Sequence, residues 1–127
     1  MGELLLNRNF IAKEDIKCGQ VIAWPATNNP QAPQVEVATN VKTQVIGISF
    51  KDVKAGEMCT YHPFITGEIV QLLAGGSVTA GVPLGVNASG KIVDAAEGTA
   101  ALPMFSVEAA SDGELFSAIT VHTNTAL

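Results

Sequence analysis

Two cysteines and two histidines supply the residue types of a zinc site in this chain of 127 residues. Cys59 and His62 are separated by two residues, a ligand-like spacing, and Cys18 and His122 could complete a Cys₂His₂ set. Zinc sites usually take a close pair of ligands from each half of the site, whereas Cys18 and His122 are isolated from each other. We therefore expect no metal site. Two cysteines are also too few for a disulfide framework, so we interpret both as reduced, buried thiols that pack as small hydrophobes.

A second candidate is a phosphate-binding loop from Gly85 to Lys91, which matches the pattern G-x-x-x-x-G-K. The next residue is Ile92, whereas the motif needs Ser or Thr there because the hydroxyl binds Mg²⁺. Such a loop also opens a helix, while Lys91 to Asp94 has the pattern of a strand. We therefore predict a β-hairpin turn, with Gly90 in the left-handed conformation, and no nucleotide site.

No other arrangement of residues in the sequence indicates catalysis. The G-x-S-x-G nucleophile motif is absent, and neither histidine belongs to a Ser–Asp arrangement that the sequence suggests. Most carboxylates flank expected turns, where solvated charges are ordinary. The sequence thus predicts a protein that is not an enzyme and uses no cofactor. A small β-barrel enzyme built around Cys59 and His62 stays as an alternative.

The composition excludes several classes of protein. Seven basic and 12 acidic residues give a net charge of −5, only 15% of residues are charged, and 47% are hydrophobic. A disordered chain needs low hydrophobicity, and a nucleic-acid binder needs basic residues to neutralise phosphates, so neither class fits. No run reaches the roughly 18 apolar residues of a membrane span, and the first residues lack the features of a signal peptide. We expect synthesis in the cytoplasm, with apolar surface hidden in a core and against other subunits.

The elements that must position any site are short β-strands. Runs rich in Val, Ile and Thr alternate with turn residues, and helical periodicity is scarce. We expect an all-β fold, a small β-barrel or sandwich with little helix. The expected strands are residues 20–24, 34–38, 44–50, 57–61, 67–73, 82–86, 91–94, 102–107 and 114–121.

The two halves of the chain repeat each other. Residues 47–58 align with residues 104–115 at an offset of 57, and residues 16–22 align with residues 78–84 at an offset of 62. Two matches in the same order indicate an internal duplication, with a pseudo-twofold arrangement and one shared core. We therefore expect a single β domain over residues 13–127, whose duplicated halves are about 13–61 and 75–121.

Residues 1–12 precede the duplication as an N-terminal arm. The arm has hydrophobic side chains and few charges, and it either pairs with the domain as an edge strand or leaves the domain to dock elsewhere. Further along, residues 25–33 contain three prolines and cannot continue a ladder, so we expect an exposed loop. Trp24, just before this loop, is either an aromatic cap over a small core or an anchor in an interface.

Phrases of the second half resemble the capsid decoration (cement) proteins of tailed bacteriophages. They are Ser77-Val78-Thr79-Ala80-Gly81-Val82-Pro83-Leu84, then Gly90-Lys91-Ile92-Val93, then Val107-Glu108-Ala109-Ala110-Ser111-Asp112-Gly113-Glu114-Leu115. The chain departs from the family pattern at Val82, where an acidic residue is usual, and at the insertion of residues 25–33.

The resemblance implies a β-tulip-like structural protein of the virion, located on the outer surface of the capsid. Its expected partners are the major capsid protein and further copies of itself, most simply as a homotrimer, with no direct contact to nucleic acid or membrane. It would stabilise capsomers against internal pressure. In this family the N-terminal arm often touches the shell, so the arm residues Leu4, Leu5, Leu6 and Phe10 are expected contact residues. Trp24 is a further expected contact with the capsid or with another subunit. Removal of residues 2–11 would then abolish capsid binding and leave a folded protein.

An alternative function is a carbohydrate- or receptor-binding β module of a virion appendage. Trp24, Tyr61 and the loop of residues 25–33 would form its binding surface. Modules of this kind usually present several exposed aromatic side chains, whereas Trp and Tyr occur once each in this chain.

Overall fold

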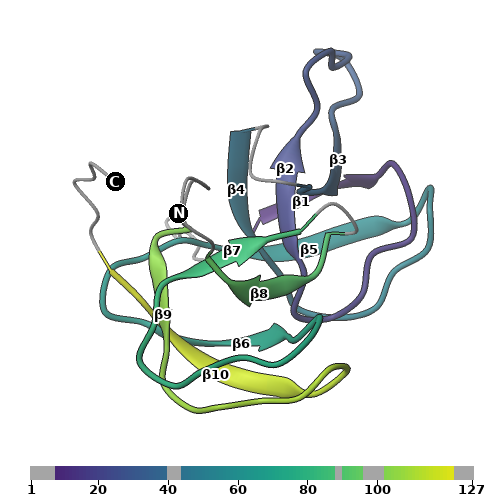
Figure 1. Ribbon diagram of the computed structural model, residues 1–127. Coiled ribbons are helices and arrows are strands. Elements are labelled where there is room, and N and C mark those ends of the chain that lie inside the picture. Colours follow the sequence, from purple (N-terminus) through teal and green to yellow (C-terminus); the bar gives the residue numbers. More distant parts are fainter. Residues whose placement is uncertain (1–7, 40–43, 88–89, 96–101, 122–127) are drawn as a thin grey trace.

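The computed structural model of the chain describes residues 8–39, 44–87, 90–95 and 102–121. Throughout these ranges the regular secondary structure consists of β-strands (Figure 1), and none of it is a helix long and apolar enough to cross a membrane. The strands are β1 (Arg8–Ala12), β2 (Val21–Trp24), β3 (Gln34–Val37), β4 (Gln44–Ser49), β5 (Met58–Pro63), β6 (Ile69–Leu73), β7 (Leu84–Val86), β8 (Ile92–Asp94), β9 (Met104–Ser106) and β10 (Leu115–Thr120).

Strands β2 to β10 confirm the strand positions expected from the sequence, with small shifts at their ends. In β6, β9 and β10 the side chains alternate between the core and the surface, as the two-residue period of a strand requires, whereas β2 and β7 are buried on both faces. In β10, for example, Phe116, Ala118 and Thr120 are buried, while Leu115 is exposed. The all-β fold class expected from the sequence is therefore confirmed.

The first unit of the molecule, residues 8–63, is a closed barrel with the strand order β1-β3-β2-β4-β5. Strand β1 closes it, because β1 pairs antiparallel with β5, from Arg8 opposite Tyr61 to Ile11 opposite Met58, and parallel with β3. Closure leaves no open sheet edge in this unit.

Strand β1 decides between the two alternatives for the N-terminal arm over residues 8–12. These residues pair with the domain, but they pair on both sides and so do not form an edge strand. Removal of residues 2–11 would take most of β1 out of the barrel, so this pairing argues against the expectation that the deletion leaves a folded protein. The part of the arm before Arg8 lies outside the described residues.

Residues 69–120 form the second unit, which repeats this strand pairing except that two of the strand pairs are isolated bridges. Strand β10 pairs with β6 and β9 as β5 pairs with β1 and β4, and β7 pairs with β8 as β2 pairs with β3. A parallel bridge from Ala74 to Ile92 stands where β1 meets β3, and an antiparallel bridge from Pro83 to Phe105 stands where β2 meets β4. The second unit thus has the topology of the first barrel, but each of these two strand pairs is reduced to a single bridge.

Backbone hydrogen bonds outside the strands repeat with the offsets found in the sequence. The amide of Gly56 donates to the carbonyl of Ala12 at 2.8 Å, and the amide of Gly113 donates to the carbonyl of Ala74 at 2.9 Å. Both glycines have positive φ, 90° and 86°, a conformation that favours glycine because it has no Cβ. The internal duplication is therefore visible in the backbone as well as in the sequence.

Each unit has a core, and the duplication also relates the two cores. The first core lies inside the closed barrel and contains Ala12, Ile16, Ile22, Val35, Val53, Cys59 and Tyr61. The matching positions of the second unit are Ala74, Val78, Leu84, Ile92, Ala110, Phe116 and Ala118, of which Ala110 is partly buried and packs against the second core, while the others are buried in it. On β5 the two core residues are the small Cys59 and the large Tyr61, whereas at the matching positions of β10 they are the large Phe116 and the small Ala118. The order of the small and the large side chain is exchanged, so the total volume in the core is similar.

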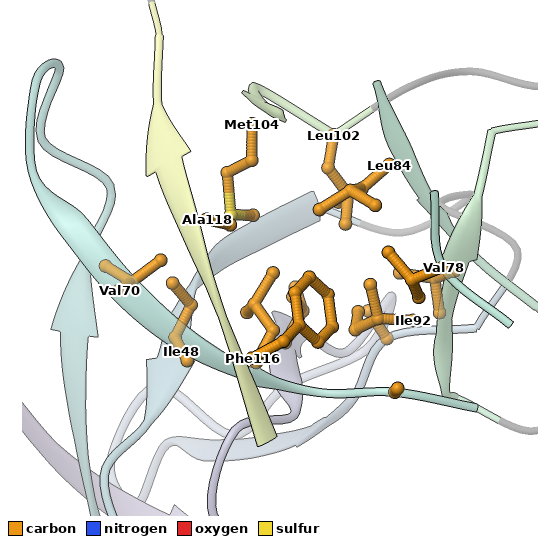
Figure 2. Packing of buried hydrophobic residues seen from close by; sticks show 14 of the residues in the cluster. Ile48, Val70, Val78, Leu84, Ile92, Leu102, Met104, Phe116 and Ala118 are labelled. Carbon is orange, nitrogen blue, oxygen red and sulfur yellow. The ribbon is translucent and has the colours of Figure 1, made fainter. Parts of the chain in front are cut away.

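The second core also takes side chains from the outside of the first barrel. Val21, Ala23 and Ile48 of β2 and β4 are 0%, 0% and 3% exposed and pack in the same cluster as Val70 and Leu72 of β6. Figure 2 shows Ile48 beside Val70 and Phe116. The second unit therefore covers one face of the first barrel, and this contact makes the two units one packed molecule.

Candidate contact surface

The predicted contact residues divide into those that the structure describes and those that it does not. Leu4, Leu5 and Leu6 lie outside the described residues. Phe10 and Trp24 are partly buried and pack against the first core, where their ring centroids are 5.3 Å apart in an edge-to-face arrangement. Phe10 also stacks on Tyr61, with centroids 6.0 Å apart and an interplanar angle of 20°. Aromatic pairs in these geometries stabilise a core beyond the area that they bury.

This arrangement bears on the role of Trp24. The side chain forms an aromatic cap over the first core, which is the first of its two expected roles. Tyr61 is only 7% exposed, so it offers little surface to a sugar. The loop of residues 25–33 is largely exposed, as predicted, and projects from the first barrel in Figure 1. Asn28 holds its base, because its side chain accepts from the amide of Gln34 and donates to the carbonyl of Gln34, both at 2.9 Å.

Cys18, Cys59 and His62, the described members of the candidate Cys–His set, are not gathered as metal ligands. Among the residues that the structure describes, no three Cys, His, Asp or Glu side chains gather as ligands, and His122 lies outside them. Cys59 is buried in the first core, with its Sγ 3.9 Å from Oγ of Ser49, and Cys18 donates to the carbonyl of Phe50 at 3.1 Å. Burial raises the pKa of both thiols, which keeps them protonated and weak as nucleophiles and as ligands.

A shallow hollow of about 330 Å³ lies between the two units, beside Cys18, Phe50, His62 and strand β6. The imidazole of His62 stacks on Phe50, with centroids 5.8 Å apart, and its Nε2 is 3.4 Å from Oε1 of Glu68. Because the Cys18 thiol is directed to a backbone carbonyl and its pKa is raised, this group of side chains lacks an activated nucleophile.

The segment that resembles a phosphate loop is a hairpin turn, as predicted. The amide of Asn87 donates to the carbonyl of Lys91 at 2.9 Å, and the amide of Lys91 donates to the side chain of Asn87 at 3.0 Å. Gly90 has a φ of 79°. A Cβ there would lie 2.3 Å from Cγ1 of Val37, so Gly90 is packed against β3 of the first unit.

The structure shows one surface that sequence reasoning missed, the outer face of the sheet β6-β10-β9. This face consists of the outward residues of the three strands: Ile69, Gln71 and Leu73 of β6, Leu115, Ser117 and Ile119 of β10, Phe105 of β9 and Val107 directly after it. Four of the six large hydrophobic side chains that are most exposed in the described ranges belong to it. Alternation in the sequence locates the two faces of a strand, but it does not tell which apolar face a second layer covers.

The geometry defines a class by fold alone: a duplicated all-β molecule made of two five-stranded units. The crystal structure of the N base of head fiber gp8.5 in bacteriophage phi29 has this fold, with a TM-score of 0.70 over 90% of this chain and 92% of that chain. The sequence identity is 19%, so the likeness establishes the fold and nothing further. No protein-family model and no curated protein matches the chain.

Proposed function

We propose that this chain is a structural protein of a tailed-bacteriophage virion that attaches to the outer surface of the head and strengthens the contacts between capsomers. The observation that supports this most is the similarity to the phi29 head fiber base, which extends over nine tenths of both chains. An entire shared fold supports a common structural task better than a shared motif would, although a fold by itself hosts many functions.

Two further features support a structural role. The turn and strand phrases of the second half resemble capsid decoration proteins, which is a sequence signal independent of the fold. Of the side chains that could have done chemistry, Cys59 packs in the first core and Cys18 donates to a backbone carbonyl. We accordingly propose a non-enzymatic protein that binds the major capsid protein and further copies of itself, as a homotrimer, without direct contact to DNA or membrane.

The closed barrel limits which residues of the N-terminal arm can be proposed to contact the shell. Phe10 and Trp24 contribute to the first core, so the shell contact proposed for the arm moves to the residues before β1, with Leu4, Leu5 and Leu6 as its anchors. Many copies of a short apolar arm on a regular lattice would bind through avidity even if each contact were weak.

The alternative of a carbohydrate-binding appendage gains no support from its expected residues. Tyr61 is buried and Trp24 packs edge-on against Phe10, so neither forms an open platform for a sugar ring. Silence of the purified protein on a glycan array is the expected result.

Co-sedimentation tests the proposal. The purified chain is mixed with heads of the phage that encodes it, prepared without the protein, and the heads are pelleted. Saturable binding with a fixed number of copies per head supports the proposal. The absence of the protein from the pellet at every concentration would contradict it, and bovine serum albumin is the control for trapping.

A further inference from the structure

The β2–β3 loop, residues 25–33, is longer than the duplicated fold requires. The offset between the two halves is 62 before this loop and 57 after it, so the first unit contains five additional residues here. In the second unit the four residues 87–90 join the matching strand positions in a tight hairpin turn. A short turn is therefore sufficient to connect this strand pair, and the barrel itself does not account for the longer loop.

The β2–β3 loop is held in one conformation by its own residues. In addition to the hydrogen bonds of Asn28 at its base, the side chain of Asn29 accepts from the amide of Gln31 at 2.9 Å. The carbonyl of Asn29 accepts from the amide of Ala32 at 3.1 Å, and Pro30 has a fixed φ angle inside this turn. A loop that is ordered before it meets a partner loses less conformational entropy when it binds.

The surface of the β2–β3 loop is exposed, polar and uncharged. None of residues 25–33 is acidic, basic or aromatic, and Thr27, Asn29, Gln31 and Ala32 are exposed. The side chains of Thr27 and Gln31 make no hydrogen bond within the described part of the chain, so both can donate to and accept from a partner. The loop lacks the aromatic platform that a sugar ring requires and suits a neutral protein surface with polar groups.

The strand register places the β2–β3 loop at the same end of the first barrel as the start of β1. Trp24 at the end of β2 pairs with Gln44 at the start of β4, and the start of β4 lies at the end of β5, because β4 and β5 are antiparallel. Arg8 at the start of β1 pairs with Tyr61 near the end of β5. The contact of Phe10 with Trp24 joins the two segments directly. The N-terminal arm and the loop are thus attached at one end of the barrel.

The charge of the chain is divided unequally between its halves. Residues 1–63 contain six basic and six acidic residues, whereas residues 64–127 contain one basic and six acidic residues, so the net charge of −5 belongs to the second half. A surface that carries an excess of one charge costs more to remove from water than a balanced surface. Of the two units, the first is therefore better suited to burial against a partner.

We propose that the β2–β3 loop binds a neutral, polar patch on the outer surface of the capsid protein, beside the contact of the N-terminal arm. The first unit then faces the shell, and the acidic second unit points away from it. This inference rests on the proposed function and adds to it the orientation of the molecule and a rigid contact element. The loop and the arm together form one binding end.

Binding to heads that lack the protein is measured by co-sedimentation for the full chain and for variants of the loop. In the first variant, residues 25–33 are replaced by Asn-Ala-Ser-Gly, the sequence of residues 87–90 of the second unit. In the second, Ala32→Arg places a bulky cation on the exposed tip. Ala55→Arg is the matched control, because exposed Ala55 lies in the corner before β5, at the opposite end of the same barrel. Circular dichroism melting curves verify that each variant folds, and light scattering gives its oligomeric state.

The wild-type chain and Ala55→Arg are expected to bind heads equally. The shortened loop and Ala32→Arg should each raise the dissociation constant at least about tenfold, because the contact is lost in one and a charge is buried against neutral groups in the other. Binding should change little from about 50 to about 500 mM NaCl, since the contact is uncharged. If one loop variant fails to fold, the other decides the result.

Several outcomes would overturn the inference. If the wild-type chain binds heads and both folded loop variants bind them equally well, the loop has no part in the contact, while the proposed function stands. Equal weakening by Ala32→Arg and Ala55→Arg would also refute a contact specific to the loop. A loop variant that loses only its oligomeric state would assign the loop to contacts between copies. A wild-type chain that does not bind heads would refute both the inference and the proposed function.

Discussion

Gly19 and Gly81 occupy equivalent corners of the two units and have similar φ angles, 90° and 81°, but only Gly19 is enclosed. A Cβ on Gly19 would lie 2.7 Å from the backbone nitrogen of Leu73, whereas a Cβ on Gly81 would meet nothing within 4 Å. The carbonyl of Gly19 also accepts from that nitrogen at 3.0 Å, so this corner belongs to the contact between the units.

Replacement of each glycine by alanine should separate conformational strain from crowding. Gly81→Ala should lower the free energy of unfolding by about 1 kcal/mol, because alanine is strained at positive φ. Gly19→Ala should cost at least about 2 kcal/mol more, because the backbone of Leu73 must move as well. Urea denaturation of both variants measures the difference. An equal loss of unfolding free energy in Gly19→Ala and Gly81→Ala would contradict the enclosure of the corner at Gly19.

The pair Ile48 and Phe105 tests which barrel face is covered. Ile48→Ala should lower the free energy of unfolding by about 3 kcal/mol, since it opens a cavity between the units. Phe105→Ala, at the matching exposed position, should cost about 1 kcal/mol or less in the monomer. Chemical denaturation at low protein concentration gives both values. Similar losses at the two positions would show that the two faces are not covered differently.

Truncation distinguishes an arm from a barrel strand. A chain that lacks residues 2–7 should keep its cooperative unfolding transition, because the deletion stops before β1. A chain that lacks residues 2–11 should lose most of its stability, since β1 closes the barrel and Phe10 packs on Trp24 and Tyr61. Thermal unfolding followed by circular dichroism compares the two, and an equally stable longer truncation would refute the closed barrel.

The two thiols should differ in reactivity in the folded protein. Cys18 is partly accessible, while Cys59 is fully buried in the first core, so iodoacetamide at about pH 8 should label Cys18 first and Cys59 only on unfolding. Peptide mass spectrometry over time locates the label. Labelling of both at one rate in the native protein would contradict the burial of Cys59.

The raised pKa of Cys59 also predicts a pH dependence. Burial raises this pKa above its ordinary value of 9.0, so the unfolded chain loses the proton at a lower pH than the folded chain. The stability that the protonated Cys59 thiol contributes is therefore complete below the pKa of the unfolded chain, and it is lost as the pH rises through the higher pKa of the folded chain. Urea titrations from about pH 7 to about pH 10 should show a steeper alkaline loss for wild type than for Cys59→Ala. An equal loss of stability with rising pH in the wild-type chain and in Cys59→Ala would contradict the raised pKa of Cys59.

Much of the fold could be predicted because local patterns and the core agree. Runs rich in Val, Ile and Thr between turn residues located most of the strands from β2 to β10, and the aligned repeat contains the equivalent corners at Gly56 and Gly113. The hairpin at Gly90 followed from the absence of a helix after the glycine-rich loop. These signals are short-range, so one sequence is enough to find them.

The candidate contact surface could not be predicted in the same way. Phe10 and Trp24 were expected at the shell because they are apolar and stand near the arm and the loop, but both pack against the first core, where Phe10 contacts Trp24 and stacks on Tyr61 of β5. Ile48 and Phe105 have the same place in the repeat, and only the packing of the second unit on the first makes one buried and the other exposed. Long-range packing of this kind leaves no mark on the spacing of residues.

The most direct measurement of the proposed function is a difference map from electron cryomicroscopy of phage heads with and without the added protein. The proposal predicts extra density of this size on the outer surface, repeated at equivalent positions of the capsid lattice. Heads that acquire no density at a saturating concentration of folded protein, or density confined to the tail, would contradict it.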